Sequence, residues 1–164
     1  MVADGIAREI TIAAPRERVW EVLTQPEFLG TWFGTGTPAQ IDLRPGGHIT
    51  ADDGTHGVAG AAGVAGTLPA LIEQVEPPTL LAFRWSQDAT GEHPTEANAT
   101  LITFTLATEP GNHTRLTVLE SGFAALALPP DEARTRLDQN GTGWTRKLTE
   151  LACYTERLMI RKRG

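Results

Sequence analysis

The last part of the chain constrains the fold most, because its apolar residues recur at helical spacing from Thr142 onward. Such spacing gathers the apolar side chains into one stripe, with charged residues on the opposite side. The pattern predicts a helix of about 19 residues, roughly 28 Å long. A shorter helix is expected from Pro130 to about Asp138, with an interruption at Asn140-Gly141. The stripe consists of Trp144, Leu148, Leu151 and Leu158, with Thr155 on the same face.

The central part of the chain alternates apolar and polar residues with a period of two, which is typical of half-buried strands. Turn sequences such as Arg44-Pro45-Gly46-Gly47 and Pro77-Pro78 separate the alternating segments. Consecutive strands with short connections favour an antiparallel meander over a parallel α/β sheet. The strands are expected at residues 39–44, 48–52, 68–75, 80–86, 98–106 and 114–121.

The N-terminal part predicts one strand and two short helices. Residues 6–13 alternate as a strand, and Pro15 is typical of a first helical position. The first helix should end before Pro26, and a second should cover Pro26 to Trp32. A lone amphipathic helix must bury its stripe on the sheet. The expected fold is therefore α+β, with a curved antiparallel sheet of about six or seven strands wrapped round a long C-terminal helix.

Length and charge exclude several classes of protein. The 164 residues fit one domain over residues 1–164. The net charge of −6 has the wrong sign for a surface that follows phosphates, so no nucleic-acid partner is expected. The single Cys153 allows no internal disulfide, and the sequence contains neither a signal-peptide pattern nor a membrane span. A cytoplasmic location is expected.

Five stretches of the sequence resemble a known superfamily when they are read in order. The chain resembles the START-like, helix-grip (SRPBCC) superfamily, and within it the homologues of the activator of heat-shock protein 90 ATPase. The resemblance implies a single START-like domain whose sheet curves round the last helix and leaves a cavity for a hydrophobic or amphipathic small molecule. The stretches are Ile10 to Thr24, Pro26 to Phe33, Asp42 to Gly47, Val75 to Trp85, and Gly143-Trp144.

Two departures from the family pattern limit what the resemblance implies. Residues 57–66 contain only Gly, Ala and Val where relatives carry bulky alternating residues, so no regular strand is expected there. Many relatives carry a histidine three residues before the Gly-Trp pair, and here that position is Asn140. A role for that histidine therefore does not transfer to this chain.

No motif in the sequence predicts a metal, a cofactor or a catalytic group. The four histidines are far apart, and Asp52, Asp53 and His56 lack a fourth ligand at a suitable spacing. Asp52, Asp53 and His56 are interpreted as a solvated acidic turn. No nucleophile elbow or phosphate-binding loop is present. We therefore expect no metal site, no cofactor and no catalytic residue.

Aromatic residues on two alternating segments are the candidates for a ligand site. Phe83 and Trp85 share a strand face with Leu81, while Phe104 shares one with Ile102 and Leu106. If these faces meet the helix, the aromatic side chains either fill a solid core or line a pocket. Polar candidates are His48, Arg84, Glu120 and Thr155. The predicted ligand-binding set is Trp32, Phe33, His48, Phe83, Trp85, Phe104, Trp144, Leu148 and Thr155.

These observations lead to three functional hypotheses. The first is a binding protein without catalytic residues, whose ligand is a lipid or an aromatic, polyketide-like molecule. The second is an enzyme of cyclase, aromatase or hydrolase type, in which His48 or Glu120 moves a proton. The third is a chaperone-interacting protein, as the family resemblance implies. Binding is favoured over the other two, and a homodimer is compatible with all three.

Overall fold

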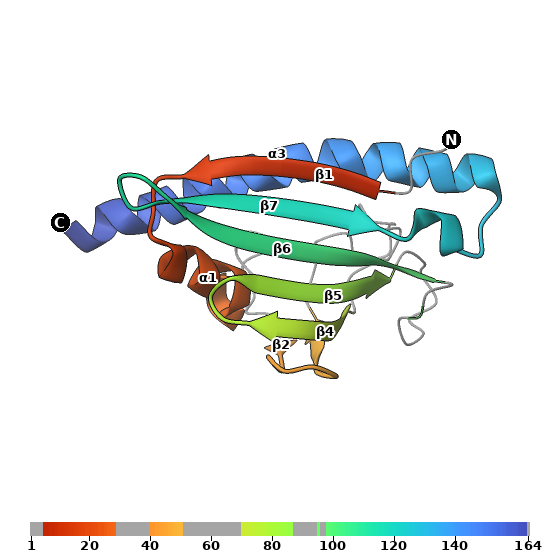
Figure 1. Ribbon diagram of the computed structural model, residues 1–164, viewed down its shortest axis with the longest axis horizontal. Helices are drawn as coiled ribbons and strands as arrows, with labels where there is room; N and C mark the ends of the chain where they lie inside the picture. Colours follow the sequence, from red (N-terminus) through yellow and green to blue (C-terminus); the bar gives the residue numbers. More distant parts are fainter. Residues whose placement is uncertain (1–4, 29–39, 51–69, 87–94, 96–97, 164) are drawn as a thin grey trace.

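The computed structural model describes residues 5–28, 40–50, 70–86, 95 and 98–163 (Figure 1). The first strand and the short helix that follows it are β1 (Gly5–Ile12) and α1 (Arg16–Thr24). A meander then comprises β2 (Gln40–Ile41), β3 (His48–Thr50), β4 (Ala70–Glu76), β5 (Leu80–Ser86), β6 (Ala99–Glu109) and β7 (His113–Ser121). The chain ends with a 3-10 turn, η1 (Phe123–Ala125), and the helix α3 (Pro130–Arg163).

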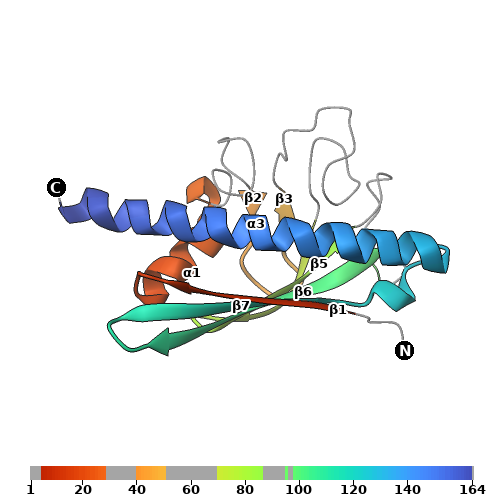
Figure 2. The same cartoon turned by 90° about the horizontal axis from the view of Figure 1, so that it is seen from above.

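The seven strands form one antiparallel sheet in the order β1-β7-β6-β5-β4-β3-β2. Every pair except β1–β7 joins strands that are consecutive in the chain. The helix α3 crosses one face of the sheet along its whole length, as Figure 2 shows from above. The predicted α+β helix-grip architecture is confirmed.

The core lies between the sheet and α3. In each long strand, alternate residues point toward the helix and are buried. The register aligns Phe83 with Ile102, Ile102 with Glu120, and Glu120 with Ile6. Every second residue along β5, β6 and β7 therefore shares the helix-facing side, as the alternation predicted for β5 and β6.

The helix α1 closes one end of this core. It begins after Pro15, whose fixed φ suits a helix start, and it buries Val19, Val22 and Leu23. The predicted second helix is described only over residues 26–28, which are helical. There the Phe28 ring meets the Tyr154 ring edge-on, with centroids 6.2 Å apart. This contact joins the start of the second helix to the C-terminal half of α3.

The predicted interruption of the last helix is wrong. A single helix of 34 residues runs from Pro130 to Arg163 through Asn140 and Gly141. Asn and Gly are poor helix formers, but tertiary contacts override a local preference of about 1 kcal/mol. The Asn140 side chain hydrogen-bonds a buried carboxyl, and Gly141 lies against β1. Both residues thus serve the packing of a continuous helix.

Candidate functional site

The helix α3 lies much closer to β1 than to the strands in the middle of the sheet. At Gly141 the helix backbone lies against two side chains of β1, since a Cβ atom there would lie 3.0 Å from Nη2 of Arg8 and 3.9 Å from Cδ1 of Ile6. On the other flank, toward β5 and β6, larger side chains span a wider separation. The interface between helix and sheet therefore has a close flank and a wide flank.

Four aromatic side chains fill the wide flank. The Trp144 ring meets Trp85 and Phe104 edge-on, with ring centroids 5.8 Å and 5.7 Å away. Phe104 also meets Phe83, with centroids 6.0 Å apart. All four side chains are buried. Edge-on contacts at these separations are favourable for aromatic rings, so we treat Phe83, Trp85, Phe104 and Trp144 as one unit, the aromatic layer.

A buried carboxyl group lies at the side of the aromatic layer. Glu120 on β7 is fully buried, and its oxygens accept hydrogen bonds from three residues. Thr100 Oγ1 donates to Oε2 at 2.6 Å, and Trp144 Nε1 donates to Oε1 at 2.8 Å. Asn140 Nδ2 lies 3.1 Å and 3.3 Å from the two oxygens. We call Thr100, Glu120, Asn140 and Trp144 the Glu120 cluster; it connects β6 and β7 to α3.

Burial raises the pKa of Glu120 above its ordinary value near 4.5. The hydrogen bonds from Thr100, Trp144 and Asn140 act in the opposite direction, because they stabilise the charged form, but desolvation is the larger effect. A carboxyl group with a raised pKa binds its proton more tightly than a solvent-exposed one does. Groups of this kind are concentrated at functional sites, although structural networks contain them too.

The structure brings together most of the predicted aromatic and helical site residues. Phe83, Trp85, Phe104 and Trp144 form the aromatic layer, and Leu148 is buried one turn further along α3. Thr155 is also buried, but its hydroxyl donates to the carbonyl of Leu151 in its own helix at 2.7 Å. Its polar group is therefore used within α3.

Other predicted residues lie elsewhere. His48 is exposed on β3, and Arg84 forms an ion pair with Glu73 across β4 and β5. Trp32 and Phe33 lie outside the described residues, as do the Asp52, Asp53 and His56 turn and residues 57–66.

Sequence reasoning missed two members of the Glu120 cluster. Asn140 was interpreted only as a departure from the family pattern, yet it lies four residues before Trp144 and so shares its helical face. Thr100 pairs directly with Trp85 in the sheet register. The helical period was a usable signal for Asn140, whereas Thr100 required the strand register.

Neither a metal-binding group of side chains nor a membrane-spanning helix is found in the described part of the chain. No group of three or more His, Cys, Asp or Glu side chains within it is arranged to hold a metal ion. None of the helices in the described ranges is long and apolar enough to cross a membrane.

Comparison with known proteins gives one family and many similar structures. Residues 13–156 match the family described as Activator of Hsp90 ATPase homolog 1-like protein. A search of curated proteins found no match.

Three solved structures illustrate the likeness. DynU16, a protein from the dynemicin biosynthetic locus, is 26% identical with a TM-score of 0.70; the alignment covers 94% of this chain but only 48% of DynU16. The Aha1 dimer from Colwellia psychrerythraea is 21% identical with a TM-score of 0.64, over 93% of this chain and 94% of that one. An HSP90 activator from Plasmodium falciparum is 15% identical with a TM-score of 0.55, over 73% and 74%.

The Colwellia psychrerythraea and Plasmodium falciparum structures are below 25% identity, so their likeness to this chain concerns the fold alone. This chain spans about half the length of DynU16. The family match covers most of the sequence and includes strands β2 to β7, the aromatic layer and the Glu120 cluster, while β1 precedes it. The chain therefore belongs to the Activator of Hsp90 ATPase homolog 1-like protein family.

Proposed function

We propose that the chain binds a hydrophobic or amphipathic small molecule, such as a lipid or an aromatic, polyketide-like compound, between α3 and strands β5 and β6. The observation that carries the proposal is the aromatic layer with a buried carboxyl group beside it. Ligand sites commonly combine apolar walls with a small number of polar groups that fix orientation. The wide flank of the helix–sheet interface has this composition.

Stability alone does not explain the Glu120 cluster. Burying a carboxyl group costs free energy, and apolar residues of similar volume often stabilise a core as well or better. The cluster places a hydrogen-bonding group next to Trp144, whose indole N–H bonds Glu120 while its ring edge contacts Trp85 and Phe104. A ligand that displaces part of the aromatic layer would therefore meet a polar group at one end.

The comparisons support a small-molecule ligand in a limited way. DynU16, which is 26% identical, is a protein in the dynemicin biosynthetic locus. The family itself includes chaperone activators by its description. The proposal thus depends first on the composition of the wide flank and second on this likeness.

The test is a fluorescence titration with cis-parinaric acid and with 1-anilinonaphthalene-8-sulfonate as probes. We expect saturable binding of one probe molecule per chain. Phe104→Leu should weaken binding about tenfold, while Leu119→Ala on the exposed outer face of the sheet should leave it unchanged. Binding that fails to saturate, or equal affinity in the two variants, would count against the proposal.

A second candidate function, catalysis of cyclase or hydrolase type, is favoured by Glu120 itself. A protonated carboxyl group beside an apolar site can deliver a proton to a bound substrate. Glu120→Gln keeps the shape of the side chain but removes the transferable proton. If a substrate is found, this variant should retain binding and lose turnover; equal turnover would restrict the site to binding.

Three further expectations stay proposals. The whole chain acting as one domain and a cytoplasmic location rest on the sequence. A homodimer is supported by the Colwellia psychrerythraea likeness, and light scattering after size exclusion measures it directly. The chaperone hypothesis is supported by the similar fold of the Plasmodium falciparum HSP90 activator. Stimulation of a chaperone ATPase by the purified protein would test it.

A further inference from the structure

The strand β1 has a free edge, and the hydrogen-bond alternation shows which of its backbone groups point there. In antiparallel strands, a residue directs its N–H and C=O to the same side, and successive residues alternate sides. The N–H of Leu106 donates to the carbonyl of Thr79, so even-numbered residues of β6 bond β5. The β6–β7 register pairs odd-numbered with odd-numbered residues, so the odd-numbered residues of β7 bond β6 and its even-numbered residues bond β1. The β1–β7 register pairs even with even, so the even-numbered residues of β1 bond β7. The odd-numbered residues therefore point to the free edge.

Two contacts agree with this assignment. The Ala7 carbonyl accepts a hydrogen bond from Nη1 of Arg8 at 2.9 Å, and the N–H of Ala13 donates to Oε2 of Glu156 at 2.9 Å. Neither group bonds β7. The outward backbone groups of Gly5, Glu9 and Thr11 form no hydrogen bond within the described residues. The edge can therefore accept another strand.

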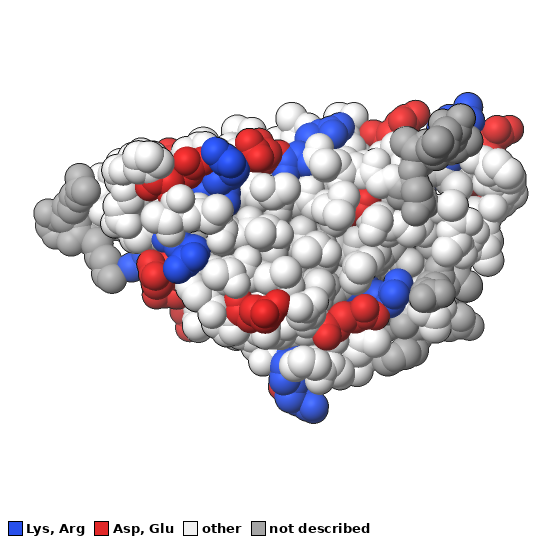
Figure 3. All heavy atoms as spheres, viewed as in Figure 1, with Lys and Arg blue, Asp and Glu red and all other residues white. Residues whose placement is uncertain are grey.

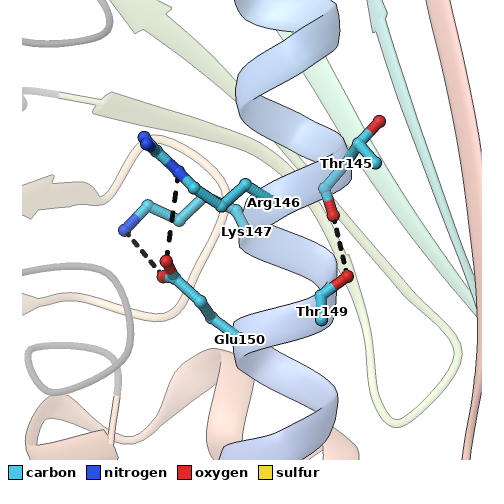
Figure 4. A network of polar contacts seen from close by, with 5 residues as sticks. All are labelled: Thr145, Arg146, Lys147, Thr149 and Glu150. Carbon is cyan, nitrogen blue, oxygen red and sulfur yellow. Dashed lines mark hydrogen bonds and ion pairs between the residues drawn. The ribbon is translucent and has the colours of Figure 1, made fainter.

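A groove of about 980 Å³ lies beside this edge, between β1 and α3. The helix lies behind β1 and projects past its free edge (Figure 1). Gly5 to Arg8 form one wall, and Gly141, Thr145 and Thr149 contribute to the other. The Thr145 hydroxyl lies 3.2 Å from the Gly141 carbonyl, and the Thr149 hydroxyl donates to the Thr145 carbonyl (Figure 4). The three threonines of this wall, Thr142, Thr145 and Thr149, thus donate their hydroxyl protons within the helix. The remaining helix residues that line the groove are Leu137, Asp138, Arg146 and Glu150.

Two cations, Arg8 and Arg146, and two carboxylates, Asp138 and Glu150, line the groove. Glu150 pairs with Lys147 at 3.3 Å and lies 4.0 Å from Arg146 (Figure 4). Arg8 has no carboxylate partner among the described residues. Its guanidinium is held by Thr145 Oγ1 at 3.2 Å and by the Ala7 carbonyl, which leaves further N–H donors unused. The Arg8 guanidinium is therefore held in place by hydrogen bonds and can still form an ion pair with an anion.

We propose that this groove binds an extended peptide with an acidic side chain, which pairs with β1 as an additional antiparallel strand. Backbone hydrogen bonds to Gly5, Ala7 and Glu9 supply affinity, as in other proteins that bind peptides by strand addition. A peptide residue opposite Arg8 places its side chain on the same face, within reach of the guanidinium. A carboxylate at that position complements the unmatched charge.

A lone peptide fits this edge better than β1 of a second copy. A second copy related by a two-fold axis would bring its own α3 to the same side of the sheet, where it projects past its own β1. The two helices would then meet in the groove. An extended peptide carries no such helix.

The test is selection of heptapeptides from a random library on the full chain, followed by affinity measurement with the synthetic peptides. We expect enriched peptides to share an acidic residue and to bind Arg8→Gln at least tenfold more weakly. Arg115→Gln is the matched control, because Arg115 is an exposed arginine on β7 that pairs with Glu109 and Glu9 on the outer face. No enrichment, or equal affinity for Arg8→Gln, would overturn the proposal.

N-methylation of alternate peptide amides distinguishes strand addition from a simple charge contact. One alternating set of methyl groups should abolish binding, because those amides face β1, and the other set should leave it nearly unchanged. Hydrogen exchange at Gly5, Ala7, Glu9 and Thr11 should slow only when peptide is bound. Equal effects of both methylation sets, or protection of these amides in a peptide-free dimer, would refute the assignment.

Discussion

The two flanks of α3 meet the sheet in different ways. On the close flank, Gly141 brings the helix backbone near β1, and Arg8 lies at the surface. On the wide flank, four aromatic rings and a buried carboxyl group fill the space to β5 and β6. On the close flank the helix backbone lies against side chains of β1 beside an open groove, whereas the wide flank is an interior of large side chains. The same helix can thus present two kinds of site.

The largest effect is expected from Trp144→Ala on the wide flank. Trp144 contacts Trp85 and Phe104 and donates a hydrogen bond to Glu120, so the change opens a cavity and removes a donor. If the layer is solid, the free energy of unfolding should fall by about 3–5 kcal/mol. Urea denaturation measures it. A loss below about 1 kcal/mol with ligand binding abolished would show that Trp144 is a pocket wall and not a core residue.

Thr100→Val should have the next largest effect, because it removes a donor to the buried carboxyl at nearly constant volume. We expect a loss of about 1–3 kcal/mol, as for a buried group left without its partner. Thr103→Val, on the same strand but the opposite face, is the matched control and should change stability little. Equal losses in the two variants would mean that the hydroxyl of Thr100 contributes nothing to the Glu120 cluster.

The pH dependence of stability should single out Glu120. Because burial raises its pKa in the folded protein, the folded state binds a proton more tightly than the unfolded state does. The resulting stabilisation is complete below pH 4.5 and is lost as the pH rises through the raised pKa. The slope is at most about 1.4 kcal/mol per pH unit for one proton. Denaturation across this range should show the slope in the wild type and not in Glu120→Gln.

Gly141→Ala should have the smallest effect. The new methyl group would lie 3.0 Å from the end of the exposed Arg8 side chain, which can shift, and 3.9 Å from Cδ1 of Ile6, which is an ordinary contact. Replacing Gly by Ala inside a helix stabilises it by about 0.5–1 kcal/mol. The free energy of unfolding should therefore stay equal or rise slightly in thermal and urea melts. A loss of several kcal/mol would show that the close flank tolerates no separation of helix and strand.

The sequence predicted the fold well because its signals are local. Alternation predicted β5 with its observed bounds and placed Phe83 and Trp85 on one face of their strand and Phe104 on one face of the next, without deciding which face meets the helix. It failed at Asn140-Gly141, because the residues that these two meet are distant in the sequence. Asn140 hydrogen-bonds Glu120 on β7, and Gly141 lies against Arg8 on β1. Local propensity carries no information about such partners.

The candidate site was predictable in part for the same reason. The aromatic side chains follow from strand alternation and helix periodicity together. The hydrogen bonds of Glu120 depend on three elements meeting with the correct register, and a shift of one residue would turn Glu120 outward. The structure was therefore required to identify Thr100 and Asn140 as its partners.

The most direct test of ligand binding at the wide flank is native mass spectrometry of the freshly purified protein, followed by denaturing extraction. We predict that a hydrophobic molecule co-purifies, or is taken up from a panel of fatty acids and aromatic polyketides, at one molecule per chain. Phe104→Leu should reduce its occupancy and Leu119→Ala should not. A ligand-free mass that stays unchanged after incubation with the whole panel would contradict the proposed function.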